Sequence, residues 1–375
     1  MQSRTSNQIR FCLSIMLLMG IGTSCEDVID LEEGDPGNEL VIYGKLTDTK
    51  GPYEISIGRA TSINQPSLPI NGALVRVIDQ DGNLETAAGQ GDGSYRFSGT
   101  QICGVPGNSY YAEIILEDGT TYRSIPETMP HSNARDSAYA GVVREEKLSD
   151  AGVPVERIFI KVWADTQLSA SNTPIYLKWD VHQVYAQLTA PLPAAKYPFY
   201  SQISCFFLEL TEPQKLHLFS STELQIDFIS EQELGTSEID LRFFNRHYFN
   251  VVQSSITFEA HRYWKQIDQV SNRSGSIFDT PPAKVLGNFY NVNDPNEEVL
   301  GYFEVAKMDT SRTFITRQNI PFLLEDPCPA LEPLVWNGFG FQDFDTLQYF
   351  YEPECLNCRL FNQKASIPRP SYFDD

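Results

Sequence analysis

The chain has few of the features that mark an enzyme or a membrane-spanning protein. The most apolar stretch lies within the first 24 residues, and no later stretch is as apolar. A helix that spans a bilayer needs roughly 20 apolar residues, and this stretch is shorter. The 5 histidines show no H-x-x-x-H or H-x-E spacing, and no G-x-S-x-G, phosphate-loop or dinucleotide-binding pattern occurs. Positive charge is scarce, since 28 Lys and Arg stand against 49 Asp and Glu, and the net charge of -21 repels nucleic acid. We therefore expect no catalytic residues, cofactor, metal or nucleic-acid partner.

Long helical patterns are also rare, whereas 24 Gly and 23 Pro supply many turns. Apolar residues make up 41% of the chain and aromatic residues 12%, which is enough for packed cores. At 375 residues the chain is long for one domain. These numbers predict a mostly β protein with two folded domains.

Residues 39–130 carry the clearest strand signals. Tyr53, Ile55 and Ile57 alternate with polar residues, and Asp-Gly turns separate further short apolar runs. Six or seven such strands within some 90 residues predict an immunoglobulin-like β-sandwich.

The segment 126–154 is polar and contains three prolines, so it is interpreted as a linker with an irregular edge. A second, larger β-sandwich domain is predicted over 131–325. It includes one amphipathic helix at about 255–271, where Ile256, Ala260, Tyr263 and Ile267 recur with a helical period.

Seven cysteines are present. Five remain for pairing, because Cys12 lies in the predicted signal peptide and Cys25 is the predicted lipid attachment site, as argued below. Cys355 and Cys358 form a C-x-x-C, but no βαβ pattern or second ligand pair accompanies them, which favours structural bridging over redox or zinc chemistry. The predicted bridge joins Cys328 to either Cys355 or Cys358. Residues 326–375 are then a cysteine-containing tail packed on the second domain.

Two oxygen-rich turns have spacing that suits calcium. They are Asp79-x-Asp81-Gly82-Asn83 and 294–298, and neither has the 12-residue loop of a strong calcium motif. Asp-Gly turns between strands need no metal, so turns are the favoured interpretation.

The first 25 residues have the pattern of an exported protein. Arg4 and Arg10 precede an apolar run, and small residues then lead to Cys25. This ending resembles the lipobox of bacterial lipoproteins, although Gly22 stands where Leu is usual. We predict a signal peptide over 1–24, lipid attachment at Cys25, and an acidic tether over 25–38.

Several segments together resemble the Bacteroidetes lipoprotein family catalogued as domain of unknown function 4249. The resemblance rests on the following segments, in this order: 24–30 (SCEDVID), 40–48, 72–79 (GALVRVID), 118–124, 259–264 (EAHRYW), 287–288, 298–303 (EVLGYF) and 353–359 (PECLNCR). The C-terminus departs from it, ending in 370–375 (PSYFDD) instead of a Pro-x-Phe-Trp.

The resemblance implies an outer-membrane lipoprotein that accompanies TonB-dependent receptors, with no established activity. Glu26 and Asp27 then resemble a surface-export signal, which places the protein at the cell surface; the periplasmic face is the alternative. Ser137 and Thr346 match the O-glycosylation sequon of that lineage.

The expected function is a non-catalytic binding or accessory module beside a TonB-dependent transporter. A structural or assembly protein of the envelope is the alternative. An enzyme would need His182, His217 or His261 in a cleft beside buried carboxylates.

Overall fold

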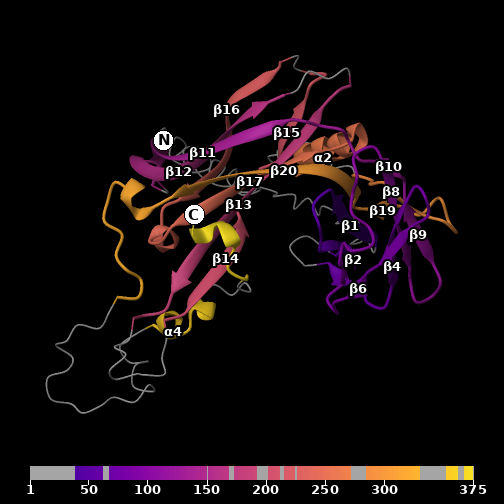
Figure 1. The fold of residues 1–375 in the computed structure, drawn as a ribbon, viewed down its shortest axis with the longest axis horizontal. Coiled ribbons are helices and arrows are strands. Elements are labelled where there is room, and N and C mark those ends of the chain that lie inside the picture. The colour runs from indigo at the N-terminus through magenta and orange to yellow at the C-terminus, as the bar shows by residue number, and fades with distance from the viewer. Residues whose placement is uncertain are drawn as a thin grey trace, which may run out of the picture.

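The computed structural model describes residues 39–61, 67–149, 151–168, 173–191, 202–211, 215–223, 226–271, 284–329, 352–361 and 367–374. Within them the chain is mostly β, which confirms the predicted fold class. Figure 1 shows the N-terminal strands gathered at one end of an elongated molecule and most of the remaining strands at the other.

Three sheets make up this fold. The largest has 11 strands, namely β14 (Ser204–Leu210), β13 (Tyr176–Leu188), β17 (His247–Ser255), β20 (Phe303–Ile315), β1 (Leu40–Thr47), β2 (Tyr53–Arg59), β7 (Ser94–Phe97) and β6 (Ala88–Gly89) in that order, with β15 (His217–Ser220), β19 (Val299–Leu300) and β3 (Leu68–Pro69) beside β13, β1 and β2. The second contains β18 (Phe289–Asn291), β9 (Thr121–Ser124), β8 (Ser109–Ile115), β4 (Leu74–Asp79) and β5 (Leu84–Thr86), with β10 (Glu127–Thr128) beside β8. The third contains β11 (Arg135–Leu148), β12 (Pro154–Gln167) and β16 (Phe228–Glu238).

Among the residues that the structure describes, the helical elements are few and mostly short. They are α2 (Phe258–Ser271), α4 (Pro353–Leu356) and four 3₁₀ turns at Leu241–Phe243, Arg317–Asn319, Cys358–Leu360 and Ser371–Asp374. No helix among the described residues is both long and apolar enough to cross a bilayer.

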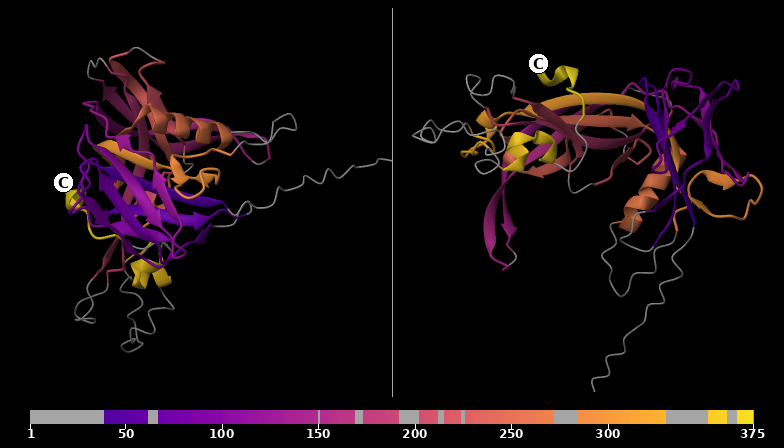
Figure 2. Two further views of the ribbon diagram at one scale, coloured as in Figure 1. Left: turned by 90° about the vertical axis from the view of Figure 1, so that its right-hand side faces the viewer. Right: turned by 90° about the horizontal axis from the view of Figure 1, so that it is seen from below.

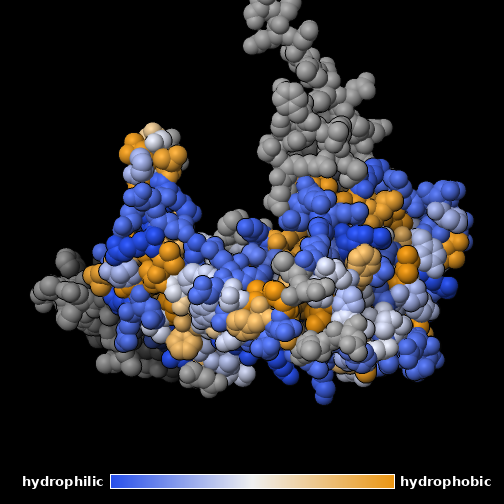
Figure 3. Space-filling view, turned by 90° about the horizontal axis from the view of Figure 1, so that it is seen from above, coloured by the Kyte–Doolittle hydropathy of each residue, from blue (hydrophilic) through white to orange (hydrophobic). Residues whose placement is uncertain are grey.

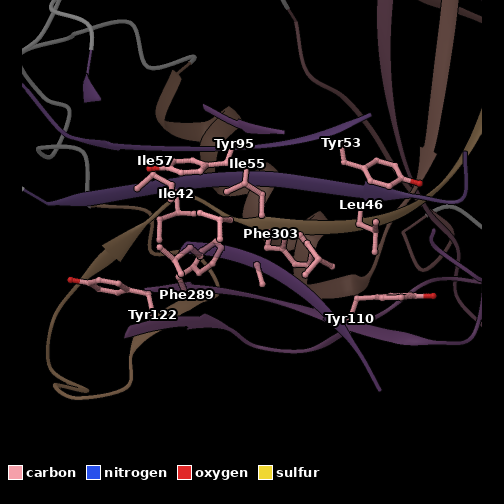
Figure 4. Close-up of a cluster of buried hydrophobic side chains, with 14 of the residues drawn as sticks. Ile42, Leu46, Tyr53, Ile55, Ile57, Tyr95, Tyr110, Tyr122, Phe289 and Phe303 are labelled. Atoms are coloured by element: carbon pink, nitrogen blue, oxygen red, sulfur yellow. The ribbon is translucent and has the colours of Figure 1, made fainter. Parts of the chain in front are cut away.

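The first core lies between β1, β2 and β7 on one side and the second sheet on the other. In β2 the alternating residues Tyr53, Ile55 and Ile57 are buried while their neighbours Glu54 and Ser56 are exposed. Figure 4 shows the buried side chains of β2 on the side of the facing sheet. The period-2 pattern of the sequence therefore produces a two-sheet sandwich here.

The sandwich is completed by strands that come late in the sequence, after most of the second half's strands. β18 pairs with β9, and β19 and the first residues of β20 run parallel to β1. β20 then continues and pairs with β17 from Lys307 to Ile315. One strand thus carries the largest sheet from the sandwich into the second half (Figure 1).

Glycines allow this returning segment to pack closely against β1. A Cβ on Gly287 would lie 1.3 Å from the carbonyl oxygen of Gly301, and Gly301 itself has a φ of 90°. The Asn288 side chain both accepts from the Phe303 backbone N–H (2.9 Å) and donates to its carbonyl (3.0 Å). These contacts explain why Gly, Asn and Gly occur at these positions.

The second core lies between the three-stranded sheet and the part of the largest sheet formed by β13, β17 and β20. It includes β11, which lies inside the polar segment 126–154. The sequence predicts a linker there, and that prediction is wrong. All 14 residues of β11 pair with β12. The strand looks polar because it is half-exposed along most of its length and exposed at its end.

Candidate functional site

A cavity of about 400 Å³ lies between α2 and the sandwich. Its lining comes from residues 125–128, from α2, from residues 286–288 and from Tyr302. Ile125 and Leu286 are 58% and 49% exposed, whereas Glu127 is only 5% exposed. Small-molecule sites are predominantly apolar with a few polar groups, and this lining is more polar than that, because Glu127, Glu259 and Arg262 contribute charged groups to it.

The start of α2 forms one wall of this cavity. Thr257 precedes the helix, and its Oγ1 accepts from the Ala260 backbone N–H at 3.1 Å, as an N-capping residue does. The same hydroxyl donates to Glu127 Oε1 at 3.0 Å. The helix therefore begins where it does partly because Thr257 joins it to β10.

Glu127 is held by three parts of the fold. Its Oε1 also accepts from the Tyr302 hydroxyl, and its Oε2 accepts weakly from the Val305 backbone N–H at 3.4 Å. Burial penalises the charged form more than these hydrogen bonds favour it, and Glu304 nearby adds repulsion, so the pKa of Glu127 rises to about 7. Burial together with Glu127 also raises the pKa of Tyr302.

Glu127→Gln is expected to change how stability depends on pH. Because the folded-state pKa of Glu127 lies above the usual value for a glutamate, its contribution to stability is complete below about pH 4.5 and is lost as pH rises toward 7. The glutamine variant lacks this loss, so its stability relative to wild type should rise across that interval. Urea midpoints at pH 4.5 to 8 measure the difference, and a pH-independent difference contradicts the raised pKa.

A second cavity, of about 280 Å³, lies on the other flank of α2. Trp264, Ile267 and Asp268 of the helix face Asp180 of β13 and His217 of β15 across it. Burial, and then the positive charge of Lys215, lower the pKa of His217, which favours the neutral imidazole. This cavity brings one of the three predicted histidines close to two carboxylates.

Behind Trp264 lies a buried ion-pair network. Glu304 Oε1 lies 3.1 Å from Lys45 Nζ, and its Oε2 lies 3.7 Å from Lys178 Nζ and accepts from Trp264 Nε1 at 2.6 Å. Burial alone would raise the pKa of Glu304, but the two lysines and the indole N–H lower it to about 2. Asp180 and the Trp264 ring also contact Lys178, at 3.5 and 4.3 Å. These charges are therefore matched within the fold.

His261 and His247 are packed as core residues. His261 is 5% exposed and its ring lies 5.2 Å from that of Tyr176. His247 is fully buried, stacks on Phe243 at 4.0 Å, and has a pKa lowered to about 3 by burial. His182 does not line either cavity.

The cysteines of the tail form two disulfides. Cys328 pairs with Cys355, the first of the two partners left open by the sequence, and Cys358 pairs with Cys205 of β14. The C-x-x-C is therefore divided between two bridges and is not a redox pair here. Cys103 is a free thiol.

The predicted modification sites are placed unequally. Ser137 is exposed on β11, which suits a glycosylated residue, whereas Cys25 and Thr346 lie outside the described residues. The first candidate calcium turn closes on itself, since Asp79 accepts from the backbone of Asp81 and Asn83. In the second, Asp294 accepts from the Asn296 backbone N–H and Glu297 accepts from the Tyr122 hydroxyl. Among the described residues no three His, Cys, Asp or Glu side chains are arranged to hold a metal ion.

Sequence reasoning missed Glu127, Lys178 and Glu304. Glu127 falls in the segment interpreted as a linker and carries no local signal. Lys178 and Glu304 stand inside runs that are apolar on both sides, at 175–181 and 302–306. A charge inside a strand buried on both faces indicates an internal partner, and that signal was available.

The architecture defines a mostly β protein in which a helix lies over the junction of two halves, with a cavity on each flank. Comparison with known families identifies it further. The chain belongs to the family described as "Domain of unknown function (DUF4249)", whose model matches residues 26–312. No curated protein matches the chain.

Proposed function

We propose that this protein is held by a lipid on Cys25 at the outer membrane, faces the cell surface, and binds a ligand without transforming it. In this role it serves a TonB-dependent transporter in nutrient uptake. The observation that carries the binding function is the 400 Å³ cavity beside Glu127, whose charged and polar lining is suited to a polar ligand.

The arrangement of ionisable groups supports binding over catalysis. Glu304 and Lys178 neutralise each other, and Glu127 is held by hydroxyl groups. His247 lies among aromatic rings, and His261 packs against Tyr176. General acid–base catalysis requires a group that reaches the reacting atoms. His217 beside Asp180 is the arrangement that favours the enzyme as a second candidate.

Cys25→Ala is expected to abolish fatty-acid labelling and leave unprocessed precursor, because the thiol is the proposed acylation site. Metabolic labelling followed by immunoprecipitation measures this. Cys12→Ala, within the predicted signal peptide, is the matched control and should be labelled as wild type is. Labelling of the Cys25 variant would refute the anchor.

The transporter partnership is tested in the same strains. After cross-linking of whole cells, a C-terminally tagged wild-type chain should co-purify with a TonB-dependent receptor, and the Cys25→Ala chain should recover much less. Recovery of no receptor, together with an envelope defect and normal nutrient uptake on deletion of the gene, would favour the structural alternative.

A further inference from the structure

A third cavity, of about 480 Å³, lies at the base of the β11–β12 hairpin. The hairpin continues beyond β16 as a two-stranded arm that projects from the second half of the molecule (Figure 2). The arm meets the three-stranded sheet where Phe159 pairs with Glu238, and both of these residues line the cavity. Its volume is within the range of about 300–1,000 Å³ that small-molecule sites occupy. None of its lining residues lines the two cavities beside α2.

Ser237 of β16 and Gln183 of β13 form the inner end of this cavity. Ser237 pairs with Ile160, a residue of the second core, and directly opposite residues of an antiparallel pair lie on the same face. Gln183 follows the core residue Val181 by two positions on its strand, so it also lies on the core face. The two side chains therefore enter the space between the sheets where the apolar core ends. They are 4% and 2% exposed.

The hydrogen-bonding groups at this inner end are not all used. Among the residues that the structure describes, none bonds to the Ser237 Oγ. Gln183 Oε1 lies 3.1 Å from His247 Nε2, whereas Gln183 Nε2 makes one long bond, to Leu210 O at 3.4 Å, although a side-chain amide has two N–H donors. A buried hydroxyl without a partner destabilises the fold. Both groups are therefore open to a ligand that enters the cavity.

The mouth of the cavity, by contrast, carries charges that are already paired. The pairs are Arg242 with Asp240 (2.8 Å), Glu238 with Arg157 (3.1 Å) and Lys147 with Glu145 (3.6 Å). An ionic ligand would have to displace one of these pairs. A hydroxyl group both donates and accepts, so it can bond to either member of a pair and leave the pair intact.

An apolar ligand fits this lining no better. Phe159 is the one apolar residue in the described lining, and Lys147 Nζ lies over its ring at 4.0 Å. The arm that carries Lys147 is largely hydrophilic along its length (Figure 3). The lining therefore suits a neutral ligand that is rich in hydroxyl groups.

We propose that this cavity binds a neutral carbohydrate, one of whose hydroxyl groups bonds to Ser237 Oγ and to the Gln183 amide. Other hydroxyl groups of the sugar bond to the paired charges at the mouth, and Phe159 gives the C–H groups of the sugar ring an apolar contact. The inference goes beyond the proposed function, because it rests neither on the lipid at Cys25 nor on the cavity beside Glu127.

The test uses the purified full chain in a detergent without a sugar headgroup, because such a headgroup would compete for the cavity. Neutral oligosaccharides of glucose, mannose, galactose and xylose are titrated by calorimetry, beside the corresponding uronic acids and amino sugars. We expect at least one neutral oligosaccharide to bind, and to bind more tightly than its charged counterparts. Ser237→Ala should lower that affinity about three- to tenfold, which is the effect of one hydrogen bond between neutral groups.

Stability separates a ligand-binding role of Ser237 from a structural one. Because no described residue bonds to its Oγ, Ser237→Ala should leave the urea midpoint of the sugar-free protein unchanged or raise it, while it weakens sugar binding. Ser56→Ala, at an exposed serine of β2, is the matched control and should change neither measurement.

The remaining outcomes overturn the inference. Binding of no neutral oligosaccharide, or of charged sugars alone, refutes the ligand class. Neutral-sugar binding that Ser237→Ala leaves unchanged places the sugar elsewhere on the protein and refutes this site. Weaker binding together with a lowered urea midpoint shows that Ser237 supports the fold and does not contact the ligand. None of these results bears on the lipid anchor or on the transporter partnership.

Discussion

Replacing Glu304 with glutamine is expected to lower the free energy of unfolding by about 3–5 kcal/mol. Glu304 is 2% exposed and Lys178 is 6% exposed, so the substitution leaves a buried ammonium group without its buried countercharge. Asp180, at 3.5 Å from Lys178, is partly exposed and compensates only in part. Urea denaturation at pH 7 measures the loss.

The matched control is Glu156→Gln on the arm. Glu156 also pairs with a cation, Arg144 at 2.7 Å, but both side chains are more than half exposed, so the expected loss is about 0–1 kcal/mol. Similar losses for the two variants would contradict a buried, mutually dependent pair. Lys178→Met combined with Glu304→Leu should recover much of the stability, because both charges leave together.

Acid gives an independent measure of the same network. The pKa of Glu304 is lowered to about 2, so its contribution to stability is present above about pH 4.5 and disappears as pH falls through 2. Glu304→Gln should remove this part of the acid dependence.

The sequence predicts those parts of the fold in which the local apolar pattern matches the side of the element that is buried in the structure. The alternation of Tyr53, Ile55 and Ile57 is sufficient to predict β2, because one face of that strand is buried and the other is not. The helical period of Ile256 to Ile267 likewise identifies α2.

The parts that it does not predict depend on pairing between distant residues. Gly44 pairs with Phe303 across the whole intervening chain, and no local pattern in either segment specifies the other. The same holds for the candidate site. Glu127 acquires its raised pKa from burial and from the nearby charge of Glu304, against hydrogen bonds from Tyr302 and Thr257 that favour the charged form. These three residues lie far along the chain, and the polar neighbours of Glu127 in sequence indicate none of them.

Removing the Cys205–Cys358 disulfide with a pair of serines is expected to destabilise the protein more than removing Cys328–Cys355. The first bridge closes a sequence separation of 153 residues and the second a separation of 27. If a disulfide acts by restricting the unfolded chain, these separations correspond to about 5 and about 3.5 kcal/mol. Guanidinium denaturation without reductant measures both, after peptide mapping of the wild type has verified the two pairings.

Packing around the first bridge adds to this expectation. Cys205 and Cys358 belong to a cluster with Tyr185 and Phe207, whose rings lie 5.4 Å apart, and Phe361 packs against it. Serines at both sulfur positions put two hydroxyl groups into that buried cluster, which adds a desolvation cost to the lost constraint. Cys103→Ser alters a free, partly exposed thiol and should cost under about 1 kcal/mol. If the 27-residue bridge proved the more stabilising one, the tail would be held mainly by Cys328, and the attachment of the C-terminal segment to β14 would be the weaker of the two.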